Sequence, residues 1–243
     1  MTDPKVEYQW DETQWGMVID VDRCIGCEAC VVACRSENNI PTVGEEQAAM
    51  SRIMDWIHLE RFYTGEYPNV RAEFVPMLCQ QCGNAPCESV CPVFASVHTN
   101  DGLNAQVYNR CVGTRFCANN CPYHVRKFNY YPPTWQSPLE QQLNPDVTAR
   151  KSGVMEKCTF CIQRIRKAEL DHRLEGTQVS DGQIRPACVQ SCPTEAMLFG
   201  DLKDKNSAVA SLANSSRSNR VLDDLNINPH IIYLRPERVD NAF

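Results

Sequence analysis

The sequence has no hydrophobic run long enough to cross a membrane. Its mean hydropathy is −0.41, and its apolar runs are short, whereas a membrane-spanning helix needs about 20 predominantly apolar residues. We therefore do not expect an integral membrane protein. The first residues contain neither a basic start followed by an apolar core nor adjacent arginines, so they predict no secretory or twin-arginine signal.

The sequence also lacks a basic excess and the common catalytic motifs. A formal net charge of −6 argues against a nucleic-acid partner, which requires a positive surface to neutralise phosphates. There is no H-E-x-x-H motif, glycine-rich phosphate loop or dinucleotide fingerprint, so we expect no catalytic residues. Four of the five histidines are interpreted as surface or packing residues rather than ligands: His58, His98, His172 and His230.

Cysteine is the residue that the sequence has in excess. Its 243 residues include 15 cysteines, an odd number that would leave at least one thiol outside a complete set of disulfides. Small secreted domains use disulfides because they lack a sufficient core, but a chain of this length can bury one. The cysteine content therefore indicates metal binding rather than a disulfide framework.

The cysteines form four groups separated by long gaps. The groups are Cys24, Cys27, Cys30 and Cys34; Cys79, Cys82, Cys87 and Cys91; Cys111, Cys117 and Cys121; and Cys158, Cys161, Cys188 and Cys192. The last three groups each contain a C-x-x-x-C-P ending, and the first has the same spacing with Arg35 in place of the proline. This repetition predicts two duplicated modules.

Short strands and helices are expected around the cysteine groups, which gives an α+β fold class. Residues 16–21 predict a strand, and Asp101-Gly102 between two β-prone segments predicts a hairpin. Residues 158–176 predict a helix that ends at Gly176. The segments 35–78 and 123–157 and the tail from residue 200 are interpreted as insertions or docking surface, and the polar residues 214–220 as a solvated loop.

The spacing of the first group is typical of iron-sulfur proteins. Residues 24–34 read C-x-x-C-x-x-C-x-x-x-C. Three thiolates at this spacing can bind three corners of an iron-sulfur cube, while the fourth cysteine binds the cluster of the partner motif. Structural zinc is the main alternative, because C-x-x-C pairs also build tetrahedral zinc sites. A zinc ribbon needs two separated pairs and does not explain four cysteines in one short run, so we favour iron-sulfur clusters.

The third group departs from this rule by one ligand. A second cysteine should fall three residues after Cys111, where the sequence has Thr114, and a threonine is a poor iron ligand beside a thiolate. Three cysteine ligands favour a 3Fe-4S cluster, which lacks one corner of the cube. The alternative is a four-iron cluster whose fourth iron binds hydroxide or water.

The four ordered motifs resemble those of a known family. They look like the four-cluster ferredoxin subunits of the molybdopterin-oxidoreductase superfamily, such as the electron-transfer subunits of dimethyl sulfoxide, polysulfide and nitrate reductases. The resemblance covers most of the chain. Two segments, RCVGTRFCANNCPYHVRKFNYY and NPDVTARKSGVMEKCTFCIQRI, are similar more narrowly to the iron-sulfur parts of alternative complex III and of the quinone reductase complex of sulfate reducers. In those relatives the same threonine replacement accompanies a 3Fe-4S cluster.

The resemblance implies ligand sets for three 4Fe-4S clusters and one 3Fe-4S cluster, which together use every cysteine. The sets are Cys24, Cys27, Cys30 and Cys192 for cluster one; Cys34, Cys158, Cys161 and Cys188 for cluster two; Cys79, Cys82, Cys87 and Cys121 for cluster three; and Cys91, Cys111 and Cys117 for the 3Fe-4S cluster. The first ferredoxin-like module would then comprise residues 1–57 with 150–200, and the second residues 58–149. Residues 201–243 would form a C-terminal docking tail.

The resemblance also implies a function and partners. The chain is expected to relay electrons between a catalytic or cytochrome-linked subunit, near cluster one, and a quinone-binding membrane subunit, near the 3Fe-4S cluster. The implied partners are a molybdopterin-type or molybdopterin-like subunit, a multi-span quinone-binding subunit and, as a further candidate, a multihaem cytochrome c. Such a complex holds the chain at the membrane periphery, on the periplasmic face by co-export with a partner or, alternatively, on the cytoplasmic face.

The segment after Cys121 carries the remaining candidate site residues: Tyr123, His124, Arg126 and Lys127. One interpretation is that they contact the membrane partner or the quinone. The simpler one, which we favour, is that the cations offset cluster charge and the aromatic rings exclude water. Two further functions stay open, namely the electron-transfer subunit of a molybdenum reductase such as polysulfide or dimethyl sulfoxide reductase, and a soluble polyferredoxin.

Overall fold

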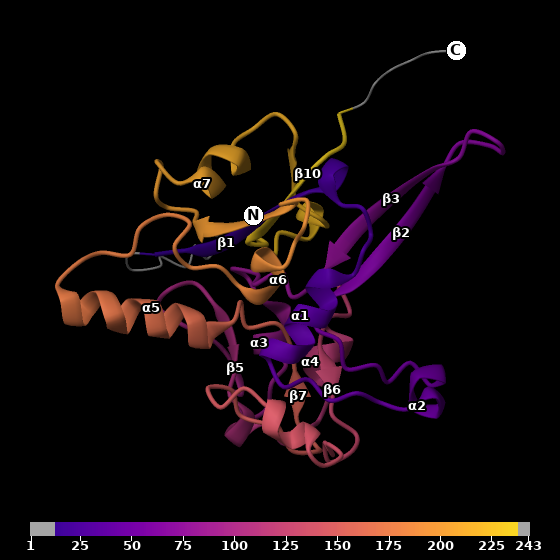
Figure 1. Ribbon diagram of the computed structural model, residues 1–243, viewed down its shortest axis with the longest axis vertical. Helices are drawn as coiled ribbons and strands as arrows, with labels where there is room; N and C mark the ends of the chain where they lie inside the picture. The colour runs from indigo at the N-terminus through magenta and orange to yellow at the C-terminus, as the bar shows by residue number, and fades with distance from the viewer. Residues whose placement is uncertain (1–12, 238–243) are drawn as a thin grey trace, which may run out of the picture.

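A four-stranded sheet organises the computed structural model, which describes residues 13–237 (Figure 1). The strand order is β8-β1-β10-β9. β1 (Trp15–Asp20) pairs antiparallel with β8 (Met197–Asp201) and parallel with β10 (Ile231–Leu234), which pairs antiparallel with β9 (Ser218–Asn219). The strand predicted over residues 16–21 is therefore β1, displaced by one residue.

Both faces of this sheet are buried. Met17 and Ile19 belong to the main core, whereas Val18 packs against Val209 on α7 (Ala208–Ala213). Because successive side chains of a strand point to opposite faces, a strand covered on both sides needs a continuous apolar run. All six residues of β1 are buried, which explains its sequence WGMVID.

Short helices follow the cysteine loops. They are α1 (Ala29–Glu37), α3 (Pro86–Ser89), α4 (Phe116–Asn119), α5 (Ile162–Glu175) and α6 (Ala187–Gln190). α1 packs against α6, and α3 packs against α4, so the first cysteine group meets the last and the two middle groups meet each other. α5 ends at Gly176 as predicted, but it begins only after Cys161, because Phe160 and Cys161 have left-handed backbone conformations.

Three two-stranded sheets complete the set of strands within residues 13–237. β2 (His58–Thr64) and β3 (Arg71–Met77) form an arm that projects from the body (Figure 1). β4 (Ser96–His98) and β5 (Asn104–Gln106) confirm the hairpin predicted at Asp101-Gly102. β6 (Lys127–Phe128) pairs with β7 (Met155–Glu156) across a long irregular loop. Mixed helices and strands agree with the predicted α+β class.

The smaller elements are one further helix and four 3-10 turns. The helix is α2 (Glu45–Ala49). The turns are η1 (Val21–Arg23), η2 (Tyr108–Arg110), η3 (Leu139–Gln142) and η4 (Asp223–Leu225). No helix within residues 13–237 is long and apolar enough to span a membrane.

Part of the segment after residue 200 is built into the sheet. β10 lies between β1 and β9, and its four residues are buried. The solvated loop expected at 214–220 is wrong in part, because Arg217 donates a hydrogen bond to Asp20 (2.8 Å) and residues 218–219 form β9. Residues 201–237 thus complete the sheet, and a docking role for the tail stays a prediction. The N-terminal residues 1–12 and the last residues of the tail, 238–243, lie outside the described residues.

Candidate metal centres

The fifteen cysteines are all free thiols in the described part of the chain. Most are buried or half-buried, and Cys27 is exposed. No two of them form a disulfide within residues 13–237.

The first set of thiols joins the two ends of the chain. Cys24, Cys27 and Cys30 lie close to Cys192. Burial, and then repulsion from the other three thiols of this set, raises the pKa of Cys30 to about 12. Cys192 accepts a hydrogen bond from the backbone N–H of Ala196 at 3.3 Å. These four thiols are the set predicted for cluster one.

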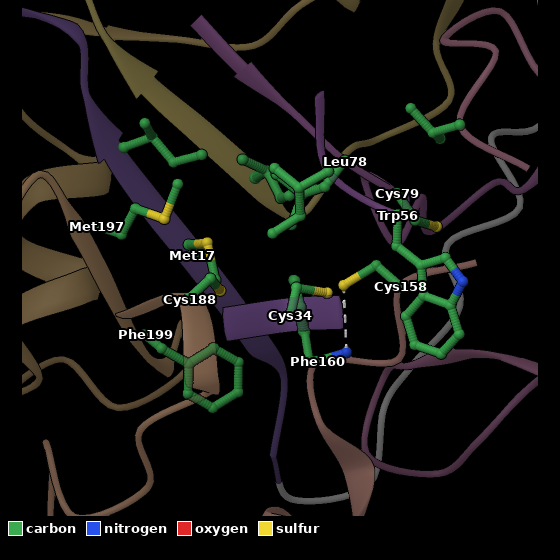
Figure 2. Close-up of a cluster of buried hydrophobic side chains, with 14 of the residues drawn as sticks. Met17, Cys34, Trp56, Leu78, Cys79, Cys158, Phe160, Cys188, Met197 and Phe199 are labelled. Atoms are coloured by element: carbon green, nitrogen blue, oxygen red, sulfur yellow. Dashed lines mark hydrogen bonds between the residues drawn. The ribbon is translucent and has the colours of Figure 1, made fainter. Parts of the chain in front are cut away.

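The second set lies inside the main core. Figure 2 shows the sulfur atoms of Cys34 and Cys158 pointing toward one another. Burial, and then repulsion from Cys158, Cys188 and Cys161, raises the pKa of Cys34 well above its ordinary value. The side-chain amide of Asn38, one helical turn after Cys34, lies 3.6 Å from the sulfur of Cys34 and 3.7 Å from that of Cys161. The four thiols are the set predicted for cluster two.

The third set surrounds a cavity. Cys79, Cys82, Cys87 and Cys121 all line one small cavity between the middle cysteine loops. Burial, and then repulsion from the other three thiols, raises the pKa of Cys82. Four thiols around a common space are the donor set that a 4Fe-4S cluster requires, so the residues of this set fit such a cluster.

The remaining three thiols lie beside the third set. Cys111 packs against the cluster of buried side chains that contains Cys117 and Met155, and its sulfur accepts a hydrogen bond from the Met155 N–H at 3.4 Å. Cys91 and Cys117 both interact electrostatically with the guanidinium of Arg126. Cys117 thus shares the neighbour Met155 with Cys111 and the neighbour Arg126 with Cys91.

Thr114 occupies the backbone position in its loop that Cys27 occupies in the first loop. Each residue follows a glycine and precedes a left-handed residue that caps a short helix. These neighbours are Gly26 (φ 71°) and Glu28 (φ 61°) in the first loop, and Gly113 (φ 73°) and Arg115 (φ 63°) in the third. Both side chains are exposed. Thr114 therefore stands where the repeat would otherwise supply a thiol.

Comparison with known proteins identifies the family. Residues 23–95 and 70–137 each match a 4Fe-4S dicluster domain. The chain is 40% identical over 226 residues to the iron-sulfur cluster-binding subunit of menaquinone reductase from Nitratidesulfovibrio vulgaris, covering 91% of this chain and 88% of that protein. The chain belongs to the family of iron-sulfur electron-transfer subunits.

Other members of this family that resemble the chain serve different complexes. Iron-sulfur subunit 1 of the Hdr-like menaquinol oxidoreductase of Archaeoglobus fulgidus is 32% identical over 244 residues, covering 93% of this chain and 84% of that protein. A polysulfide reductase subunit from Wolinella succinogenes is 31% identical over 227 residues, covering 93% of this chain and 96% of that protein. Iron-sulfur clusters, rather than zinc, are therefore the cofactors of this electron-transfer subunit. Within residues 13–237, no three His, Cys, Asp or Glu side chains converge on a site for a single metal ion.

The four candidate residues after Cys121 do not form one surface in this iron-sulfur subunit. Tyr123 is buried, lines the cavity of the third set and donates a hydrogen bond to the carbonyl of Val221 at 2.7 Å. Arg126 is also buried, whereas His124 is exposed and Lys127 is half-buried. Burial lowers the pKa of Lys127, although Asp55 partly opposes it. Tyr123 and Arg126 thus lie near thiols, and the simpler interpretation stays a prediction.

The four histidines have protein partners. His58 pairs with Glu60 at 3.0 Å, His98 with Glu88 at 2.7 Å and His172 with Thr177 at 2.5 Å, and His230 contacts Gln14 at 2.8 Å. These contacts agree with their interpretation as surface or packing residues.

Sequence reasoning missed three buried polar residues beside the thiols. Asn38 lies between two sulfurs of the second set. The ammonium of Lys157 and the amide of Gln81 each donate a hydrogen bond to the carbonyl of Cys158 at 2.9 Å. Each residue lies within four positions of a cysteine, so their proximity to the motifs was the available signal.

Proposed function

We propose that this iron-sulfur subunit relays electrons between a catalytic or cytochrome-linked partner and a quinone-binding membrane subunit of a respiratory complex. The observation that carries the proposal is the proximity of thiols from distant loops, such as Cys30 to Cys192 and Cys34 to Cys188, together with Thr114 at the position equivalent to Cys27. The menaquinone reductase and menaquinol oxidoreductase relatives support the assignment to a quinone-linked complex.

The proposed ligands are the four sets given by the family pattern. Cluster one, cluster two and cluster three would each have four cysteine ligands, and the 3Fe-4S cluster would have Cys91, Cys111 and Cys117. The first module would comprise residues 1–57 with 150–200 and the second residues 58–149. The packing of α1 on α6 and of α3 on α4 supports this division.

The chain's residues would prepare these sites in two ways. Burial raises the pKa of Cys34 and Cys188, so their thiols must lose protons when the clusters bind. Backbone N–H groups then stabilise the thiolates, as Ala95 does for Cys91 at 3.1 Å. When bound, the clusters supply one-electron transfer.

Two exposed apolar patches are the proposed contact points for partners. Ile25 and Val32, beside Cys27, are 60% and 67% exposed, and Val112 and Phe116, beside Thr114, are 63% and 57% exposed. The patch at Cys27 would face the molybdopterin-type, molybdopterin-like or cytochrome partner. The patch at Thr114 would face the multi-span quinone subunit. The chain would then be peripheral to the membrane, on its periplasmic or its cytoplasmic face.

Electron paramagnetic resonance of the purified complex tests the cluster assignment. The oxidised wild-type complex should give the signal of a 3Fe-4S cluster. Iron analysis of this subunit should find one iron atom fewer than four 4Fe-4S clusters would contain. Thr114→Cys supplies the fourth thiolate, so it should diminish this signal and add the missing iron. Thr114→Val supplies no ligand and should keep the signal. A wild-type complex without the signal and with four complete cubes would contradict the proposal.

Fractionation separates the quinone-linked function from two alternatives. A soluble polyferredoxin would be recovered alone and free of membranes. An electron-transfer subunit of a molybdenum reductase, as suggested by the polysulfide reductase relative, would copurify with a molybdenum-containing subunit that reduces its own substrate. The proposed function predicts recovery with a membrane subunit and quinone-dependent reduction or oxidation of the clusters.

A further inference from the structure

Arg126 lies between two sets of thiols. Its side chain is buried, with the residue 5% exposed. Nη1 lies 3.2 Å from the sulfur of Cys87, which belongs to the third set, and the guanidinium also interacts with Cys117, which belongs to the three-cysteine set. One cation therefore contacts ligands that the proposed function assigns to two neighbouring clusters.

Within residues 13–237, Arg126 has no carboxylate among its hydrogen-bond partners. Nη1 lies 3.3 Å from the amide oxygen of Asn104, and Nη2 donates a hydrogen bond to the amide oxygen of Gln106. Nε is buried and has no hydrogen-bond partner in the described part of the chain. A buried charge is costly unless an opposite charge compensates it. Among the described residues, the negative groups that face Arg126 are the sulfurs of Cys87, Cys117 and Cys79 once they are thiolates.

We propose that Arg126 raises the reduction potentials of cluster three and of the 3Fe-4S cluster together, and so matches two successive steps of the electron relay. This inference rests on the proposed function, because it uses its ligand sets. Lys127, the next residue, shares the charge but interacts with His58 and Asp55. The sequence alone does not distinguish these two cations.

The sign of the effect follows from the charge change on reduction. A cluster that accepts one electron gains one negative charge, and no bond or proton transfer needs to accompany it. The buried guanidinium attracts the reduced state more strongly than the oxidised state, since screening by water is weak in the interior. Removing the positive charge must therefore disfavour reduction at both centres.

The test is a redox titration of the purified complex, followed by electron paramagnetic resonance. Arg126→Gln should lower the potentials of cluster three and of the 3Fe-4S cluster by about 59 mV or more, which is a tenfold change in a one-electron equilibrium. Arg126→Lys keeps the positive charge, so both reduction potentials should stay close to their wild-type values. The potentials of clusters one and two should stay at their wild-type values.

Two further variants keep the test decisive if Arg126→Gln assembles poorly. Gln106→Glu leaves the arginine in place and sets a carboxylate against Nη2, so it should lower the same two potentials. Lys127→Gln removes a neighbouring charge that does not face the thiols, and it should change neither potential.

The possible outcomes separate this inference from the proposed function. Intact signals with unchanged potentials in Arg126→Gln and Gln106→Glu would overturn the inference and leave the cluster assignment standing. A change in the reduction potential of only one of the two clusters would overturn the claim that Arg126 acts on both. A wild-type complex without a three-iron signal would overturn the ligand assignment, and the inference with it.

Discussion

The ring of Phe74 lies directly against Gly26 in the first cysteine loop. A Cβ atom on Gly26 would sit 2.7 Å from Phe74 Cδ1, and Gly26 has a φ of +71°. An alanine in this left-handed conformation costs about 1–2 kcal/mol, and the contact would also push the β2–β3 arm away from the loop. We expect Gly26→Ala to lower the free energy of unfolding of the cluster-loaded chain by at least about 1 kcal/mol in a denaturant titration.

The matched control for this prediction is Gly44→Ala. Gly44 has an extended backbone (φ −72°), and apart from its two chain neighbours no atom of the described residues lies within 4 Å of a Cβ built there. This variant should stay within about 0.5 kcal/mol of the wild-type stability. Equal losses in the two variants would show that the contact with Phe74 is unimportant.

Arg150 and Glu156 form a buried ion pair that supports the second cysteine set. Nη2 of Arg150 lies 2.9 Å from Oε2 of Glu156, and the side chains are 1% and 0% exposed. Arg150 also donates a hydrogen bond to the carbonyl of Asn38 at 2.6 Å. Glu156→Gln would leave the guanidinium without its counter-charge, so we expect a loss of about 3 kcal/mol in the free energy of unfolding.

An exposed ion pair provides the comparison for Glu156→Gln. Arg61 and Glu28 are 3.0 Å apart, with side chains 53% and 51% exposed. Because water screens such a pair, Glu28→Gln should cost less than about 1 kcal/mol. Similar losses from Glu28→Gln and Glu156→Gln would contradict the role given to burial.

His230 should make the stability depend on pH. Burial, together with the nearby His98 and Arg220, lowers its pKa to about 3. Between that value and the unfolded value near 6.5, the unfolded chain binds a proton that the folded chain does not. The free energy of unfolding should therefore fall as the pH falls through about 6.5, by up to about 1.4 kcal/mol per pH unit.

Denaturant titrations at pH 7.5 and pH 5.5 check the role of His230. His230→Gln should reduce the difference in unfolding free energy between the two pH values, even if it lowers stability at both. An unchanged difference in His230→Gln would assign the pH dependence to other groups.

Local features of the cysteine loops could be predicted because short-range geometry determines them. All three C-x-x-x-C-P endings fold into the same turn, in which the third residue after the last cysteine is left-handed. These residues are Phe94, His124 and Glu195. The spacing of cysteine and proline is enough to specify such a turn, so the sequence located the loops and the position of Thr114 within its own loop.

Long-range packing could not be predicted in the same way. β10 pairs with β1 more than two hundred residues away, and an apolar run near the end of the chain does not reveal its partner. Similarly, the sequence predicted that Arg126 offsets cluster charge, but its burial depends on Asn104 and Gln106 from β5. The contacts of Arg126 follow from tertiary structure, which motif spacing does not encode.

Removal of the clusters should abolish cooperative folding. The main core contains seven cysteines, and the third set surrounds a cavity. Without metal, these buried thiols would line empty spaces and lose the binding free energy that is coupled to folding. We expect the cluster-free chain to bind a hydrophobic dye, to lose its near-ultraviolet circular dichroism and to unfold without a cooperative transition.

Reconstitution supplies the control for cluster removal. Treatment of the same sample with iron and sulfide under anaerobic conditions should restore the near-ultraviolet signal and a cooperative transition, which irreversible damage would not permit. Because the m-value reports the surface exposed on unfolding, any residual transition of the cluster-free chain should have a clearly smaller m-value than the transition of the reconstituted chain. A cooperative transition of the cluster-free chain with an undiminished m-value would mean that the apolar packing around Met17, Phe160 and Ile165 suffices to fold it.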